Sequence, residues 1–313
     1  MANNKRNTLP ASLSRTVAPF APLALALLVG NAVLPGSHVT APPEGGIAEV
    51  KAVACGEGLE DYKACHSEYP TGCNTQGSYD PYLNLFKNQV SWQKTDVQGW
   101  FNELSQLQTL ESKIPAGLSK TNHGDHLDEL NKLGEGSIFG IVGYLYGIKT
   151  EGKESSNCQL EGGDDFDNVD FHIYIGFDPN LAARIKSKTM TPEDKKTIDV
   201  VSVIVEMTPH YRGRFKPEWT ADAVKKELGS RVRVTGQLMV DNEHYVASQD
   251  CGHANHTDAC WRATVWELHP VTDFQICSAG SCPDQNSVGW VPLGRQSPVQ
   301  TAHSSNAAGS QNP

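Results

Sequence analysis

One long strand pattern constrains the fold of this chain more than any other feature of its sequence. Residues Ser137 to Lys149 are mostly β-branched, apolar and aromatic, and glycines stand at positions 140, 143 and 147. Glycine inside a strand permits a sharp bend or the close approach of another backbone. A strand that is both long and strongly bent is typical of a small barrel, in which each strand coils around a closed core.

The elements after this strand predict a five-stranded barrel. Two apolar or alternating stretches follow it, then a helix that is capped by Thr220 and stops at Gly229, and then two more strands. The predicted ranges are Asp170 to Phe177, Val200 to Met207, the helix Ala221 to Leu228, Arg231 to Val240 and Arg262 to Ile276. A helix between strands three and four is the layout of an OB-like barrel. We therefore expect a mainly β fold over residues 134–277, with a generic α+β sheet as the alternative.

Less regular segments are expected on both sides of the barrel. Residues 55–133 contain three cysteines and two helical patterns, one opened by Asp80 and one opened by Asp96, with Trp100 placed in the second helix. This pattern predicts a short helical, Cys-containing N-terminal segment. Residues 278–313 are rich in Ser, Gln, Asn and Ala without periodicity, which predicts a disordered tail.

The N-terminus has the pattern of an export signal. Basic residues precede an apolar run from Val17 to Leu34, so residues 1–34 are predicted to be a signal peptide and residues 35–54, with several Pro and Gly, a linker. The alternative is one uncleaved membrane anchor, although prolines at positions 19 and 22 leave the uninterrupted run short of the ~20 residues that a span needs. No later segment is predicted to cross a membrane. The protein is therefore expected to be secreted or periplasmic.

The eight cysteines are an even number, which predicts disulfides in an exported chain. We expect Cys251 and Cys260 to be bonded to each other, and Cys277 to pair with Cys282 or with the cysteines of the N-terminal segment, because short separations close easily. The alternative for the first pair is a metal loop that includes the two histidines between them. Their spacing is not that of a zinc finger, which favours the disulfide.

The charge balance disfavours one large class of function. The chain has 26 basic and 36 acidic residues, and its net charge is −10 without a basic stripe. Affinity for phosphate backbones comes from clustered Lys and Arg, so non-specific nucleic-acid binding is disfavoured. The sequence also lacks the common motifs of serine hydrolases, phosphate loops, zinc proteases and dinucleotide-binding domains.

Several phrases in the central part of the chain resemble a family of uncharacterised bacterial proteins. These phrases are Gly143-Tyr-Leu145, Glu154-Ser-Ser-Asn-Cys158, Asp170-Phe-His172, Val205-Glu-Met-Thr-Pro209 with Arg212, Val232-Arg-Val-Thr-Gly236 through Asp241-Asn-Glu-His244, and Trp266-Glu-Leu-His-Pro-Val271. The resemblance implies an OB-like barrel and carries no activity. The stretch from Cys251 to Cys260 is extra relative to this family, so its role is particular to this chain.

Two strand motifs indicate a metal site on the face of the barrel that points away from its core. Because strand side chains alternate, Asp170 and His172 share one face, and Glu267 and His269 likewise lie opposite their apolar neighbours. Glu206 has the same placement on the third strand. A small barrel can bring these five side chains onto one outward patch, and such a set suits zinc or another divalent transition metal. The alternative is a group of solvated or hydrogen-bonded residues without a ligand.

Two weaker sets of side chains are interpreted as structural. Tyr144, Tyr146 and Tyr174 have rings that could stack on bases or sugars, but alternating strand positions favour packing. His123 and His126 lie in a connector that contains Gly and Asp, and we expect them to form a solvated turn.

These features favour an exported, disulfide-stapled OB-like binding module whose ligand the sequence does not identify. The first alternative is a metal-dependent hydrolase, for example a phosphodiesterase or nuclease, that uses the His and carboxylate patch with a divalent metal. The second alternative is an envelope protein with an interaction surface and no active site. Metal content separates the hydrolase from the other two hypotheses.

Overall fold

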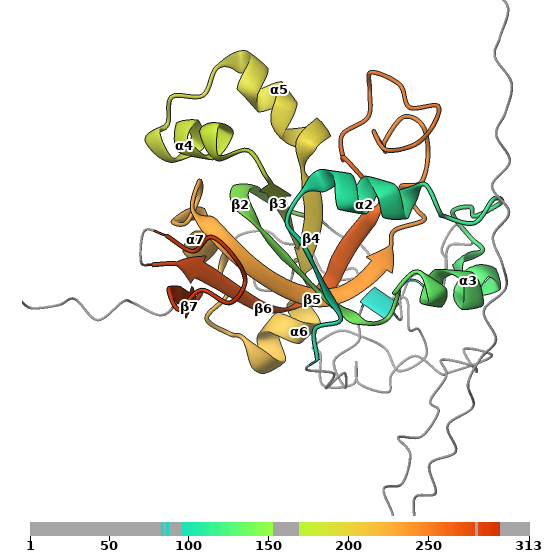
Figure 1. The fold of residues 1–313 in the computed structure, drawn as a ribbon, viewed down its shortest axis with the longest axis horizontal. Helices are drawn as coiled ribbons and strands as arrows, with labels where there is room; N and C mark the ends of the chain where they lie inside the picture. Colours follow the sequence, from blue (N-terminus) through green and yellow to red (C-terminus); the bar gives the residue numbers. More distant parts are fainter. Residues whose placement is uncertain (1–82, 84–85, 88–95, 153–168, 279–280, 295–313) are drawn as a thin grey trace, which may run out of the picture. The chain divides into compact units, whose positions relative to one another are not determined.

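A closed barrel of five strands forms the centre of the protein (Figure 1). The computed structural model describes residues 83, 86–87, 96–152, 169–278 and 281–294, all within one compact unit of residues 47–313. The barrel strands are β2 (Ile138–Thr150), β3 (Phe171–Gly176), β4 (Val203–Met207), β5 (Arg231–Val240) and β6 (Trp266–Cys277). Their order is β2-β3-β4-β6-β5, and β5 pairs with β2 to close the ring.

The strand directions match an OB-like barrel. β4 and β6 are parallel, and every other pairing within the ring is antiparallel. The helices α6 (Pro209–Phe215) and α7 (Ala221–Lys225) stand between the third and fourth strands. The mainly β, OB-like fold predicted from the sequence is therefore confirmed, although α7 is shorter than predicted and α6 was not expected.

β2 closes the barrel because it pairs with two different strands along its length. Its first half is antiparallel to β5 and its second half to β3, with Tyr144 in both pairings. A Cβ atom at Gly140 would collide with the Trp100 ring, and one at Gly143 would meet the carbonyl oxygen of Gly176. The glycines predicted to permit bending therefore also permit close approach of neighbouring chain segments.

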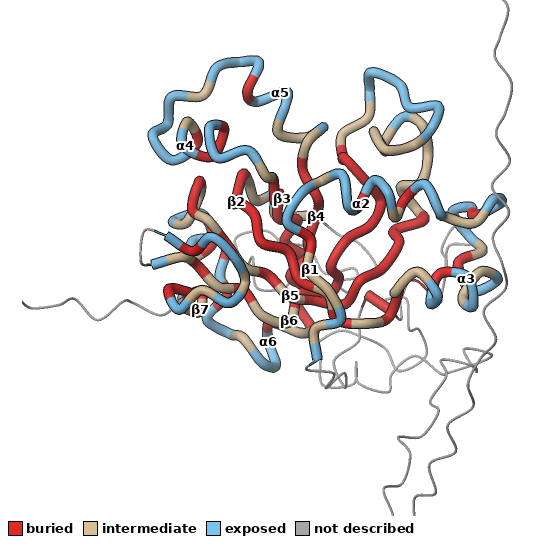
Figure 2. The backbone as a smooth tube through the Cα atoms, viewed as in Figure 1, coloured by how far each residue is buried: buried red, intermediate tan, exposed pale blue. Residues whose placement is uncertain are grey.

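Alternating side chains fill the barrel core. On β3, Phe171 and Ile173 are buried, and their ladder partners on β4 are Met207 and Val205. Leu268 of β6 is paired with Val205 and extends the same apolar layer. Figure 2 shows that the barrel strands are buried over most of their length. Complete burial of each such side chain contributes about 1.5–3 kcal/mol, so this layer is a main source of stability.

The helices α4 (Pro179–Ser187) and α5 (Pro192–Val201) cover part of the outer face of the barrel. Their apolar side chains pack against Tyr146 of β2, Tyr174 of β3 and Ile204 of β4. Both tyrosines are buried, which confirms their interpretation as packing residues. OB-like proteins commonly bind ligands on this side of the barrel, but here two helices occupy it.

The N-terminal part of the described chain differs from the sequence prediction. Residues Leu83, Phe86 and Lys87 are helical, as the pattern after Asp80 predicts. The helix expected from Asp96 is wrong at its start, because β1 (Gly99–Phe101) is a strand parallel to β2. The space above a glycine of β2 accommodates the Trp100 ring of β1 and favours the strand. The helices that follow are α2 (Leu104–Glu111), the 3-10 helix η1 (His123–His126) and α3 (Leu127–Lys132).

Two strand boundaries and the predicted tail also need correction. The third strand begins at Val203 rather than Val200, because the last turn of α5 reaches Val201, and the fifth begins at Trp266 rather than Arg262. Disorder throughout 278–313 is wrong for residues 281–294, which include β7 (Trp290–Pro292), antiparallel to β6. The buried Trp290 ring supplies the apolar contact that orders this short stretch, a signal too local for periodicity to reveal.

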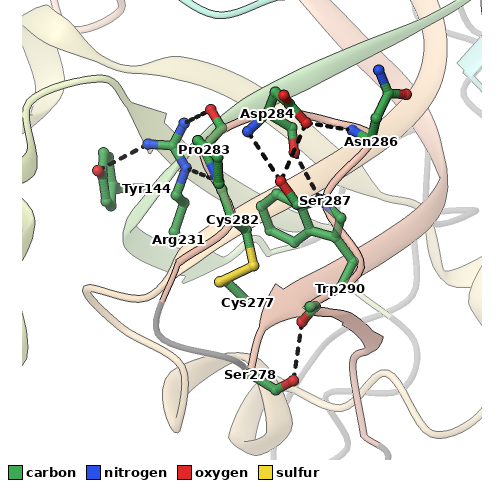
Figure 3. Close-up of a disulfide and its surroundings, with 11 residues drawn as sticks. Tyr144, Arg231, Cys277, Ser278, Cys282, Pro283, Asp284, Asn286, Ser287 and Trp290 are labelled. Carbon is green, nitrogen blue, oxygen red and sulfur yellow. Dashed lines mark hydrogen bonds between the residues drawn. A yellow bond between two sulfur atoms is a disulfide. The ribbon is translucent and has the colours of Figure 1, made fainter.

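Two disulfides fasten the connections at the barrel's ends. Cys251 is bonded to Cys260 and Cys277 to Cys282, the pairings that the short separations predict. Figure 3 shows Arg231 beside the second bond, where its Nε–H donates a hydrogen bond to the carbonyl oxygen of Cys282. This disulfide therefore helps to hold the segment that leads into β7.

Replacing both Cys251 and Cys260 with Ser is expected to lower the free energy of unfolding by about 2–3 kcal/mol, because the bond closes a short loop in the unfolded chain. Urea unfolding of the exported, oxidised protein measures the effect. Ser248→Ala, an exposed change just before the loop, is the control. Equal unfolding midpoints for the double variant and the control would contradict the expected contribution of the disulfide.

Several sequence predictions concern residues outside the described ranges. They are the signal peptide 1–34, the linker 35–54, the N-terminal cysteines at 55, 65 and 73, and Cys158. Within the described ranges, no helix combines the length and apolar character that crossing a membrane would require.

Candidate metal centre

The five side chains predicted to form a metal patch lie together on β3, β4 and β6 and at the residue just before β3. These residues, called the polar cluster below, are Asp170, His172, Glu206, Glu267 and His269. His172 and Glu206 are direct partners across the β3–β4 ladder. The parallel contact of β4 with β6 brings Glu267 and His269 beside them. The alternation of strand side chains therefore places all five residues on the face opposite the barrel core, as predicted.

The residues point away from the barrel core, but the expectation that this outward face is open to solvent is wrong. The five residues of the polar cluster are between 0 and 8 % exposed. Distant segments cover them: Arg262 lies on the connection between β5 and β6, and Lys87 belongs to the N-terminal segment. Burial of charged groups is costly unless they are paired, so the contacts within the cluster determine what it can do.

His269 is the best-connected member of the polar cluster. Its Nδ1 lies 3.0 Å from Glu206 Oε2 and 3.3 Å from Glu267 Oε1, and its Nε2 lies 3.6 Å from Asp170 Oδ2. Burial lowers the pKa of His269, but the charge and hydrogen bond of Glu206, with the hydrogen bond of Glu267, outweigh burial and raise the pKa to about 10. The site therefore strongly favours a positive charge at the position of this ring.

Glu206 lies between the two imidazoles. Its Oε1 is 3.1 Å from His172 Nε2, while its Oε2 faces His269. Burial raises the pKa of Glu206, but the neighbouring charges of His172 and His269 outweigh burial and hold that pKa well below its usual range. The two histidines thus reach opposite oxygens of one carboxylate, so the sequence expectation that both rings bind one ion does not match this arrangement.

The other end of the polar cluster is neutralised by two buried cations. Arg262 is 3.3 Å from Glu267 Oε2 and 3.4 Å from Asp241 Oδ2, and Lys87 is 3.3 Å from the same Asp241 oxygen. Burial lowers the pKa of Arg262 and of Lys87, but Asp241 and other carboxylates outweigh burial and raise both values. Burial and the charges of Glu206 and Asp241 raise the pKa of Glu267 to about 7. At this end, the carboxylates of Glu267 and Asp241 are therefore already paired with buried cations.

Two groups of carboxylate and imidazole atoms converge closely enough to hold a metal ion. In the first group, ligand atoms of Asp170, Glu206 and His269 all lie within 4.8 Å of one another. Ligands around a tetrahedral zinc ion are about 3.4 Å apart, given bonds of about 2.0–2.2 Å. The 3.6 Å between His269 Nε2 and Asp170 Oδ2 is close to this value. Because Glu206 faces Nδ1 and Asp170 faces Nε2 of the same ring, binding of one ion by all three residues requires one of these side chains to rotate.

The second group is less suitable for a cation. It consists of Glu206, Asp241 and Glu267, and the last two carboxylates already face Arg262. A metal ion there would lie close to a buried guanidinium of the same sign. We therefore assign the candidate centre to Asp170, Glu206 and His269, called the ligand triad below.

One buried atom of the ligand triad also lacks a hydrogen bond. Among the described residues, none forms a hydrogen bond with His269 Nε2. Buried polar atoms are nearly always hydrogen-bonded, and those that are not call for a specific explanation such as an ion. The donor set of one nitrogen and carboxylate oxygens fits a divalent transition metal.

The ligand triad lies where two long connections leave the barrel. Asp170 ends the connection between β2 and β3, and residues 241–265 connect β5 to β6. In OB-like barrels these two connections commonly contact ligands. The position in the fold and the chemistry of the side chains thus indicate the same end of the barrel.

Sequence reasoning missed three charged residues that complete this region. Asp241 belongs to a stretch noted for its resemblance, but its role was not predicted, and Lys87 and Arg262 carried no local signal. His123 was expected in a solvated turn, yet it is buried, with Nδ1 2.9 Å from Asn242 and Nε2 2.9 Å from Glu135. These contacts join residues far apart in the sequence, so local patterns could not reveal them.

In comparisons with known proteins, no family model, curated protein or solved structure matches the chain. Its chemistry must therefore be inferred from the arrangement of its own residues.

Proposed function

We propose that the protein is an exported, disulfide-stapled OB-like binding module whose ligand is a divalent transition-metal ion, held by Asp170, Glu206 and His269. The observation that supports this proposal is the convergence of the three ligand atoms within 4.8 Å at the loop end of the barrel. Two carboxylates and one neutral imidazole carry a charge of −2, which balances a divalent cation. The export component rests on the signal pattern and agrees with the two disulfides.

Binding is favoured over hydrolysis by the burial of the ligand triad. A hydrolytic metal centre needs space beside the ion for a substrate and a water molecule. Asp170 and His269 are completely buried and Glu206 is 2 % exposed. An envelope protein with only an interaction surface would have no use for converging ligand atoms. A retained metal ion is therefore the function that this geometry supports best.

Metal titration tests the proposal. Protein stripped with a chelator is expected to take up one Co²⁺ or Zn²⁺ ion per chain, and Asp170→Asn or His269→Gln should weaken binding by more than about 100-fold, because each removes a ligand. Elemental analysis gives the stoichiometry, and the visible spectrum of Co²⁺ reports the coordination. His256→Gln and Asp258→Asn, both on the exposed disulfide loop, are the matched controls.

The wild-type titration keeps this test independent of whether a buried variant folds. Absence of stoichiometric binding by the folded wild-type protein would refute the metal centre. Equal affinities of Asp170→Asn, His269→Gln and the loop controls would place any bound ion elsewhere.

A further inference from the structure

We propose that Glu151 and His172 form the route along which the ion reaches Glu206, an inference that rests on the proposed metal centre. Both residues lie outside the ligand triad, and neither is needed to complete it. Their carboxylate and imidazole groups lie between the ligand triad and the surface, and each of these groups can contact a metal ion.

Short distances link these side chains in sequence. Glu151 Oε1 is 3.1 Å from His172 Nδ1, and His172 Nε2 is 3.1 Å from Glu206 Oε1. Lys149, His172 and Glu206 are paired with one another across the neighbouring strands β2, β3 and β4. The route therefore runs across these strands at the level of His172, and Glu151 lies two residues after Lys149. An ion that moves along it passes from one carboxylate or imidazole to the next without leaving polar contacts.

The exposed fraction of the side chain increases steadily along the route from Glu206 through His172 to Glu151. The side chain of Glu206 is 2 % exposed, that of His172 is 10 %, and that of Glu151 is 16 %. Lys149, whose ammonium is 3.0 Å from Glu151 Oε1, is 62 % exposed and lies at the surface. The gradient identifies Glu151 as the outermost carboxylate of the series.

The opposite side of the polar cluster presents the wrong charge for entry. Arg262 and Lys87 are buried there and both are cationic. A divalent ion that passes them meets like charges in a weakly screened interior, where repulsion is strong. The Lys149 charge at the other mouth is exposed, paired with Glu151 and screened by salt, so it opposes entry much less.

The rates of metal binding test the route, since a group on a route alters association and dissociation together, whereas a ligand alters affinity. In stopped-flow measurements with Co²⁺, Glu151→Gln is expected to slow both rates about tenfold, while Kd changes by less than about threefold. Lys149→Ala is expected to speed association at low salt and to have little effect at high salt. Glu193→Gln, an exposed carboxylate on α5, is the control.

Three results would contradict the route, and one of them would also contradict the metal centre. Metal binding with unaltered rates in Glu151→Gln overturns the route alone. A large change in Kd with unchanged association overturns it as well, because Glu151 would then be a ligand. Absence of binding by the wild-type protein at equilibrium overturns the metal centre and the route together.

Discussion

Replacing Glu111 with Gln is expected to stabilise the protein at neutral and alkaline pH and to remove the contribution of Glu111 to the pH dependence of its stability. Glu111 ends α2 and is buried, and its Oε2 accepts a hydrogen bond from the Val265 N–H at 3.1 Å. Burial, with the hydrogen bond and charge of the neighbouring Asp250 carboxyl, raises the pKa of Glu111 to about 9. The folded protein therefore holds a proton on Glu111 at neutral pH.

The direction of the effect follows from proton binding. In the unfolded chain Glu111 releases its proton near the usual value of 4.5, whereas the folded chain retains it up to about pH 9. Between these values the folded state binds more protons, so stability falls as pH rises, by at most about 1.4 kcal/mol per pH unit. A Gln amide preserves a donor to Asp250 and does not ionise. The variant should therefore exceed the wild type by several kcal/mol at pH 8 and match it near pH 4.

Urea unfolding at pH 4, 6 and 8 measures this difference. Asp258→Asn, an exposed acid in the nearby disulfide loop, should retain the wild-type pH dependence. If the wild type and Glu111→Gln lose stability with pH in parallel, the proton on Glu111 is not the cause.

Replacing Arg262 with Met is expected to destabilise the protein by about 3–5 kcal/mol, because it leaves buried carboxylates without their cation. Arg262 is completely buried and pairs with Glu267 and Asp241. Arg184→Met is the matched control, since Arg184 makes a bidentate contact with Asp194 near the surface, and exposed pairs contribute about 0–1 kcal/mol.

A double variant separates charge from packing. Arg262→Met combined with Glu267→Gln should recover part of the lost stability, since one of the unpaired carboxylates is then neutral. Thermal and urea unfolding of the wild type, Arg262→Met, the double variant and Arg184→Met give the comparison. A loss in Arg262→Met no larger than that in Arg184→Met would mean that the buried pairs do not contribute as described.

The barrel was predictable because its strands have strong local patterns. The glycines of β2 and the alternation in β5 placed both strands nearly at their observed bounds. α4 was missed although Asp178 accepts hydrogen bonds from the first turn of this helix, as an N-cap does, because nine residues are too few for a clear helical period. β1 and β7 have three residues each, and only their partners define them as strands.

The candidate site was predictable in composition but not in environment. Alternation alone placed Asp170, His172, Glu206, Glu267 and His269 on one face. Their burial depends on residues such as Lys87, which lies 154 positions from its partner Asp241. Strand periodicity carries no information on contacts of this range. The same limit explains why the position of Glu206 between the two imidazoles was not predicted.

The pairing of β7 with β6 covers an edge of β6 that could otherwise pair with a strand of another molecule. Gln275, Ile276 and Cys277 of β6 form their ladder with β7, well beyond the contact of β6 with β4. An unpaired strand edge is a template on which another chain can add, and this is a common start of aggregation. Trp290 and the adjacent disulfide fix β7 in place, so another chain cannot pair with this stretch of β6.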